Sequence, residues 1–241
     1  MPIPRSCVIA FLCVCTVGLQ LVHAEPAATQ PFKPTSEYVQ REIRGWTVLV
    51  NGDLLSRDPP LSAACLDLLD AKLLDVERAV PPRALAKLKP VHIWLELHDP
   101  RFPGGAYHPS RQWLIENGFN PDKAKSVELG NARNFLSWSK EQPMMVLHEL
   151  AHAYHDQVLG YDDPDIAAAY EAAKHDGLYE HVLRSNGHIE RAYALNNDQE
   201  YFAELSEAFF GTNDFFPFVR AEIGQHDPRM LKVLKDKWNR D

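Results

Sequence analysis

Short segments of alternating apolar and polar residues mark the N-terminal half of the chain and predict β-strands. Residues 47–50, 91–97 and 126–129 combine this alternation with β-branched or aromatic side chains. The Asn51-Gly52 pair directly follows the first segment. It predicts a tight hairpin turn into residues 53–55, because asparagine and glycine accept positive φ.

Beyond residue 142 the apolar positions recur every three or four residues, which predicts helices almost to the C-terminus. One helix is bounded by Pro143 and Gly160, since proline favours a first helical turn and glycine a helix end. A second is predicted over 197–211, and an earlier one over 61–80. Strands first and helices afterwards predict an α+β fold, with a small N-terminal sheet and a mainly helical C-terminal part.

The first 24 residues have the features of a signal peptide. Arg5 supplies a positive charge, residues 7–22 are nearly all apolar, and Val22-His23-Ala24 offers small residues before a cleavage site. The apolar run is short for a membrane-spanning helix, which needs about 20 residues. We therefore expect a secreted or periplasmic protein without stable membrane association after cleavage; an uncleaved membrane anchor is the alternative.

The composition is that of a globular protein: 45% of the residues are hydrophobic and 24% are charged. The formal net charge of −8 argues against a nucleic-acid partner, which would require a basic patch. Residues 25–36 read as an extended leader, and the absence of a flexible linker predicts a single domain over 37–241. Cys65 is the one cysteine outside the signal peptide and is expected to be a buried, unreactive thiol.

The segment from His148 to His152 has the pattern HExxH. Because His148 and His152 lie four positions apart, their imidazoles project from one face of a helix and can bind one Zn²⁺ at about 2.0–2.1 Å. Glu149 is placed to act as the general base that takes a proton from the attacking water in metal-assisted peptide hydrolysis. HExxH also arises by chance, but here it lies in a bounded amphipathic helix, among small and apolar neighbours.

A catalytic zinc ion needs a third protein ligand and an open position. His155 follows His152 on the same rigid helix, so we expect it at the surface or beside a ligand rather than on the metal. Two downstream candidates remain: Glu171, and the helix that carries Glu200 and Glu204. The second helix is favoured because its two carboxylates are stacked at i and i+4; a capping role for Glu200 is the alternative.

The HExxH segment and residues 193–204 together resemble the catalytic core of the anthrax lethal factor-like metallopeptidases. The resemblance covers about residues 143–211 and rests on the order and spacing of HExxH, Tyr193 and the Glu-Tyr-Phe-Ala-Glu sequence from Glu200 to Glu204. It implies a zincin fold with Glu200 as the third zinc ligand. It also implies that Tyr193 stabilises the oxyanion, and that Glu204 supports a ligand histidine.

Residues and resemblance together predict a secreted zinc metalloendopeptidase with one Zn²⁺ per chain and a peptide or protein substrate. Two alternatives stay open: a non-catalytic zinc-binding module of the cell envelope, and an amidase acting on cell-wall peptides. We expect residues 127–129 to form the edge strand along which a substrate adds. Trp94, Trp113 and Trp138 are expected in the core.

Overall fold

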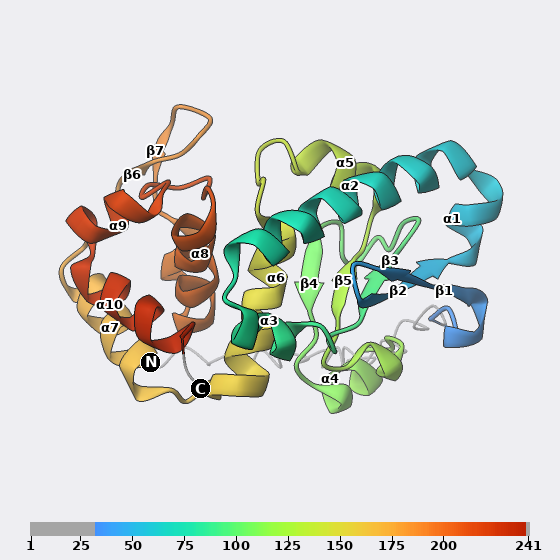
Figure 1. Ribbon diagram of the computed structural model, residues 1–241, viewed down its shortest axis with the longest axis horizontal. Coiled ribbons are helices and arrows are strands. Elements are labelled where there is room, and N and C mark those ends of the chain that lie inside the picture. Colours follow the sequence, from blue (N-terminus) through green and yellow to red (C-terminus); the bar gives the residue numbers. More distant parts are fainter. Residues whose placement is uncertain (1–31, 240–241) are drawn as a thin grey trace, which may run out of the picture. The chain divides into compact units, whose positions relative to one another are not determined.

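The main sheet has five strands in the order β1–β2–β3–β5–β4 (Figure 1). A computed structural model describes residues 32–239, so the predicted signal peptide and the leader up to residue 31 lie outside the described residues. The strands are β1 (Tyr38–Ile43), β2 (Trp46–Asn51), β3 (Ile93–Leu95), β4 (Gly105–Tyr107) and β5 (Val127–Leu129).

The edge strand on the side of the later helices is β4, which pairs antiparallel with β5. Strands β2, β3 and β5 are parallel to one another, and β1 is antiparallel to β2. The prediction that residues 127–129 form the edge is therefore wrong, because β5 lies between β3 and β4. Its buried Val127 and Leu129 suit an interior strand, whereas Gly105-Ala106-Tyr107 gives only a weak strand signal in the sequence.

The predicted hairpin turn at Asn51-Gly52 is also wrong. The observed hairpin joins β1 to β2 through Arg44 and Gly45, both of which have positive φ. Asn51 instead caps the helix α1 (Gly52–Arg57), because its side chain accepts a hydrogen bond from the backbone N–H of Asp53. Asparagine serves turns and helix N-caps equally well, so the dipeptide alone does not distinguish them.

The helices predicted from the apolar spacing are present, which confirms the α+β class. After α1 come α2 (Pro59–Ala79), α3 (Pro82–Leu88), α4 (Arg111–Glu116), α5 (Ala132–Trp138), α6 (Met145–Tyr154), α7 (Pro164–His175), α8 (Asp198–Phe210), α9 (Arg220–His226) and α10 (Pro228–Lys237). Shorter elements are η1 (Thr35–Glu37), η2 (Pro121–Lys123), the π-helical η3 (His155–Leu159), the hairpin of β6 (Val182–Leu183) and β7 (Ile189–Glu190), and η4 (Tyr193–Leu195). In the described part, no helix is long and apolar enough to cross a membrane.

Helix α6 lies between the sheet and the C-terminal helices (Figure 1). All of its side chains are buried, and it contacts β4 and β5 on one side and α8 on another. Trp238, after α10, stacks on Tyr154 of α6 and on Phe202 of α8. These contacts hold α6 and α8 together, so side chains that face each other across them sit on rigid elements.

Cys65, the only cysteine among the described residues, is buried as the sequence predicts. Cys65 is fully buried in α2 and donates a hydrogen bond to the backbone carbonyl of Ala132. Burial raises the pKa of its thiol to about 11, so it stays protonated at neutral pH and is a poor nucleophile.

Candidate metal centre

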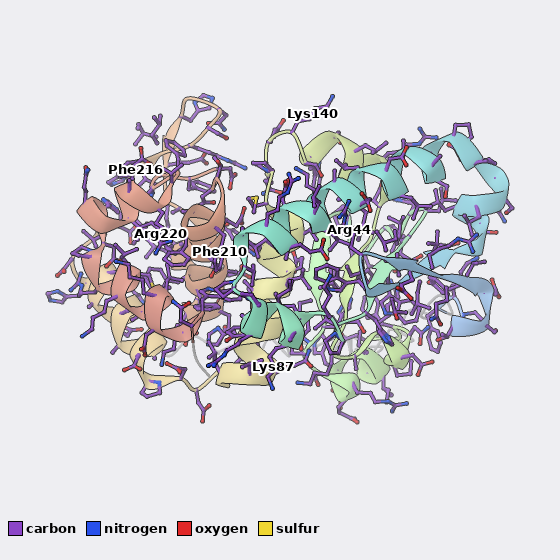
Figure 2. The ribbon with its side chains drawn as sticks, viewed as in Figure 1. Arg44, Lys87, Lys140, Phe210, Phe216 and Arg220 are labelled. Atoms are coloured by element: carbon purple, nitrogen blue, oxygen red, sulfur yellow. The ribbon has the colours of Figure 1, made fainter. Side chains whose placement is uncertain are left out.

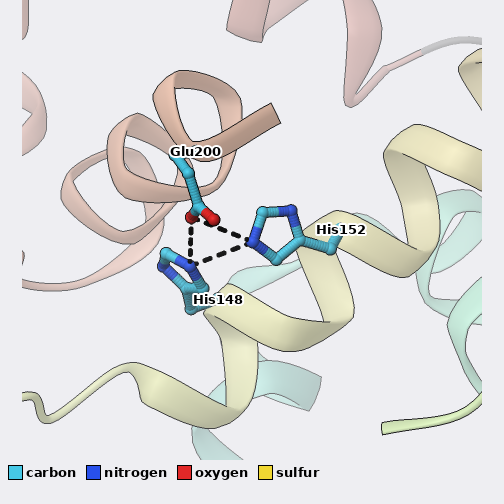
Figure 3. Close-up of side chains that lie close together, drawn as sticks. All are labelled: His148, His152 and Glu200. Atoms are coloured by element: carbon cyan, nitrogen blue, oxygen red, sulfur yellow. Dashed lines mark hydrogen bonds and ion pairs between the residues drawn. The ribbon is translucent and has the colours of Figure 1, made fainter. Parts of the chain in front are cut away.

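Three nitrogen and oxygen atoms from α6 and α8 meet in a small triangle (Figure 3). His148 Nε2 and His152 Nε2 lie 3.1 Å apart. Glu200 Oε2 lies 3.1 Å from the first and 3.2 Å from the second. The three residues predicted to bind a metal are thus brought together, although Glu200 follows His152 by 48 residues in the chain.

The dimensions of this triangle suit a tetrahedral zinc ion. Two ligands at 2.0–2.1 Å from such an ion are separated by about 3.3–3.4 Å, close to the observed distances. A trio of two imidazoles and one carboxylate also leaves a fourth position open, as catalytic zinc requires. The residues present therefore fit the metal that the sequence suggests.

The local sequence explains why Glu200 points at the histidines. Asn197 caps α8 by accepting a hydrogen bond from the backbone N–H of Glu200, which fixes the first turn of the helix. Glu200 is therefore not the capping partner considered as an alternative; its carboxylate contacts His148 and His152. Asn197 supplies the cap and leaves the glutamate free for the centre.

A carboxylate that the sequence analysis missed holds the other ring nitrogen of His148. Nδ1 lies 2.7 Å from Oε1 of Glu207, so it donates to that carboxylate and leaves Nε2 as the atom facing the triangle. Glu204, for which the resemblance implies this contact, lies 3.8 Å away. Glu207 is one turn further along α8. Nothing in the sequence singles it out, because its spacing from Glu204 (i, i+3) also fits an ordinary solvent-facing side of a helix.

Hydrogen bonding dominates the electrostatics of the triangle. Burial would lower the pKa of His148, but hydrogen bonds to Glu200 and Glu207 raise it well above the ordinary value. Burial would likewise raise the pKa of Glu200, and the contacts to both histidines lower it. Each group therefore depends on its partners for its charge state.

The two glutamates behind His148 are fully enclosed. Burial and the neighbouring charge of Glu207 raise the pKa of Glu204 well above its usual range, and burial also raises that of Glu207. One oxygen of each makes no hydrogen bond to any residue that the structure describes. No lysine or arginine in this part of the chain pairs with Glu200, Glu204 or Glu207; among the described residues, their ion-pair partners are His148 and His152.

Glu149, the predicted general base, lies beneath the edge strand. Its side chain makes no hydrogen bond to a described residue and lines the cavities on both sides. A Cβ added to Gly105 of β4 would come within 2.7 Å of its Oε1. A side chain at this position would displace the carboxylate from where it lies, so β4 and Glu149 face the same space.

Tyr193 is the second predicted catalytic residue, and it is also at the centre. Its hydroxyl donates to Oε1 of Glu200 at 3.4 Å, and its side chain is 47% exposed. Burial and the charge of Glu200 raise its pKa, so the hydroxyl remains a hydrogen-bond donor. It lies in η4, just before α8, and reaches over the side where Glu149 also lies.

The remaining candidates lie away from the triangle. Glu171 is exposed on α7 and pairs with Lys174. His155 is fully buried between Tyr161 and Phe202, so of the two expected positions, at the surface or beside a ligand, the surface one is wrong. The π-helical turn that begins at His155 sends its ring inward, and burial lowers its pKa to about 4.

Two cavities meet at the centre, and His148, Glu149 and Tyr193 line both. The Trp138 hollow, of about 320 Å³, is further lined by Trp138, Gln142, Met145, Arg184 and Phe215. The Tyr107 hollow, of about 410 Å³, is further lined by Phe102, Tyr107, Pro109, Tyr161 and Glu200. Trp94 is buried as expected, but Trp113 and Trp138 are 45% and 38% exposed, so for them the core prediction was wrong.

Comparison with known proteins adds no assignment. No family model, no curated protein and no solved structure matches the chain.

Proposed function

We propose that the chain is a zinc-dependent peptidase of the zincin type, with His148, His152 and Glu200 as the metal ligands. The observation that carries this proposal is the triangle of ligand atoms 3.1–3.2 Å apart, with Glu149 beside it and open to both cavities. The resemblance to the lethal factor-like metallopeptidases points in the same direction. It assigns Glu200 and Tyr193 by order and spacing; in support, Glu200 contacts both histidines, and the Tyr193 hydroxyl lies 3.4 Å from Glu200.

The roles of the residues follow from their positions. When bound, a zinc ion would lower the pKa of a water molecule and polarise the substrate carbonyl. Glu149 has no competing partner among the described residues, and it takes a proton from the attacking water. Tyr193 donates a hydrogen bond to the carbonyl oxygen as negative charge develops there. Glu207 holds the ring of His148 in one orientation through Nδ1.

The substrate is an extended peptide that adds to β4. An edge strand offers unpaired backbone groups, and β4 is short, free on its outer side and directly above Glu149. Gly105 and Ala106 supply backbone without bulky side chains at this point. A peptide bound there would place one of its peptide bonds between Glu149 and Tyr193.

The test compares the exported protein with its Glu149→Gln variant, and with Glu171→Gln as a control of the same chemistry. We expect one zinc per chain in all three by mass spectrometry of the metal. Casein cleavage should fall about 10²–10⁴-fold in Glu149→Gln alone. A wild-type protein without zinc overturns the proposal. Zinc without hydrolysis of casein or cell-wall peptides indicates a non-catalytic module, and cleavage of cell-wall peptides alone an amidase.

A further inference from the structure

Arg184 reaches the Trp138 hollow from the hairpin of β6 and β7 and is held in one orientation. Its backbone N–H bonds to the carbonyl of His188 across the hairpin, and the residue bridges to Phe215 in the loop after α8. Its Nε donates to the buried carboxylate of Asp214 at 3.1 Å. The guanidinium carbon lies 4.8 Å from the ring centroid of Phe215. An arginine fixed from three sides is pre-organised for binding.

The guanidinium still has donors to offer. Its Nη1 is 3.6 Å from Glu190, a loose contact, and Nη2 has no partner among the described residues. Gln142 lines the same hollow and adds an amide. The acidic groups behind, Glu204 and Glu207, keep an oxygen each that solvent does not reach. Arg184 and Gln142 therefore offer hydrogen-bond donors in a hollow that Glu204 and Glu207 also line.

The direction of β4 determines which part of a bound peptide lies in the Trp138 hollow. The N-terminal end of β4, at Gly105, lines the Trp138 hollow, whereas Ala106 and Tyr107 line only the other one. Antiparallel addition is the more stable pairing for an edge strand. In that direction the substrate runs past Tyr107 first and past Gly105 afterwards. Residues that follow the cleaved bond therefore lie in the Trp138 hollow, toward Arg184.

We propose that Arg184 recognises a carboxylate in one of the first two residues after the cleaved bond. This inference rests on the proposed peptidase function. A guanidinium and a carboxylate form paired hydrogen bonds that few other groups match. The carboxylate belongs either to an acidic side chain or to the free C-terminus of a short product. Arg184 also lines a further hollow of about 420 Å³, together with Asn186 and Lys140 (Lys140 is labelled in Figure 2), which leaves room for either.

The experiment measures kcat/KM on matched peptides whose cleavage site is mapped by mass spectrometry. One series places Glu or Gln, and Asp or Asn, at the first and second positions after the bond. A second series ends at either position with a free carboxylate or an amide. Wild type should prefer the acid by about 10- to 100-fold in one series, which identifies the source. The same acids placed before the bond should give no preference.

Arg184→Gln should abolish this preference, and Arg184→Lys should keep part of it. The preference is a ratio on one preparation, so a lower folded fraction in a variant does not change it. Arg220→Gln is the matched control: this exposed arginine begins α9 (Figure 2), lies over Phe209 and lines none of the three hollows. Equal rates for acid and neutral peptides in wild type, or an unchanged preference in Arg184→Gln, would overturn the inference.

Peptide binding separates this inference from the peptidase proposal. Fluorescence anisotropy of labelled acid and amide peptides is measured on the Glu149→Gln background, with and without Arg184→Gln. Tighter binding of the acids that depends on Arg184 supports carboxylate recognition even if wild type cleaves no peptide. Cleavage by wild type with neither kinetic nor binding preference leaves the peptidase proposal standing and removes the role of Arg184.

Discussion

Two of the clusters of buried ionisable side chains in the described part of the chain differ in how their charges are balanced. The sheet cluster consists of Glu96, His108, Lys123 and Glu128, on one face of β3 and β5. Lys123 donates to Glu96 at 2.7 Å and to Glu128 at 2.5 Å, and His108 lies 2.6 Å from Glu128. The metal cluster of His148, His152, Glu200, Glu204 and Glu207 contains no lysine or arginine.

The comparison separates buried charges that are balanced by protein partners from buried charges that are not. In the sheet cluster the carboxylates of Glu96 and Glu128 both pair with the ammonium group of Lys123, so their charges are balanced within the protein. The metal cluster opens to two cavities and keeps two carboxylate oxygens without partners in the described part. A protein retains such an unbalanced arrangement at a cost in stability, which is typical of functional sites.

The largest expected effect concerns the third ligand. Glu200→Ala removes one corner of the triangle, so zinc should be lost at chelator concentrations that leave wild type loaded. Glu171→Ala should keep its zinc, because Glu171 is exposed and paired with Lys174. Competitive titration with a chelator measures both. Zinc loss in Glu171→Ala and not in Glu200→Ala would remove the ligand assignment and the family resemblance together.

Tyr193→Phe should lower kcat by about 10²–10³ while zinc content stays unchanged, as for loss of one oxyanion donor. Its hydroxyl is 3.4 Å from Glu200, so the contribution of this contact to zinc binding is small. Steady-state kinetics and metal analysis on the same preparation provide the comparison. A kcat close to that of wild type would leave Tyr193 with a structural role only.

A smaller effect distinguishes the two glutamates behind His148. Glu207→Gln replaces the carboxylate that accepts from Nδ1, and zinc affinity should weaken by about 10–100-fold. Glu204→Gln, with the oxygen 3.8 Å away, should change zinc affinity less. The ratio of the two dissociation constants is the readout. If Glu204→Gln weakened zinc binding more than Glu207→Gln, then Glu204 would be the residue that supports His148, as the resemblance implies and against the observed distances.

A substitution in the sheet cluster should have the smallest effect on zinc affinity and the clearest effect on the stability of the fold. Burial would raise the pKa of Glu128, but the hydrogen bond with His108 and the charge of Lys123 lower it. A depressed pKa stabilises the fold above the unfolded value of 4.5, and this contribution is lost as pH falls below it. Lys123→Met leaves both carboxylates buried without their cation, which should lower the free energy of unfolding by about 3–5 kcal/mol.

Urea unfolding at several pH values tests this assignment, with the exposed Lys174→Met as control. Wild type should lose stability as the pH falls below about 4.5. Lys123→Met should gain stability between pH 7 and 5, because its carboxylates then take up protons. Its zinc affinity should match that of wild type. A pH dependence identical to wild type would mean that Lys123 and Glu128 are not coupled.

The elements with long periodic patterns were predicted well from the sequence. The helices that carry HExxH and Glu200 are bounded by Pro143 and Asn197, and local residues alone mark such limits. Edge-strand position was not predicted, because strand order depends on contacts between distant segments. The alternation in residues 126–129 predicts a strand, but it does not indicate which strands lie beside it in the sheet.

The site shows the same division. HExxH and the helix of Glu200 were predicted because residue types and spacing in the sequence indicate metal chemistry, whereas Tyr193 was predicted only through the resemblance to the lethal factor-like metallopeptidases. Glu207 and Arg184 were missed, since each gains its meaning from a contact across the fold: one with His148, the other with Asp214. His155 was misplaced because a regular helix was assumed where the chain forms a π-helical turn.

The most direct measurement is the anomalous diffraction of crystals of the purified protein, recorded on both sides of the zinc absorption edge. The account predicts one peak per chain, about 2.0–2.1 Å from His148 Nε2, His152 Nε2 and a carboxylate oxygen of Glu200. Glu149 should lie beside the peak without touching it. A protein that holds no zinc after purification without chelator, or a peak held by other residues, would contradict the central claim.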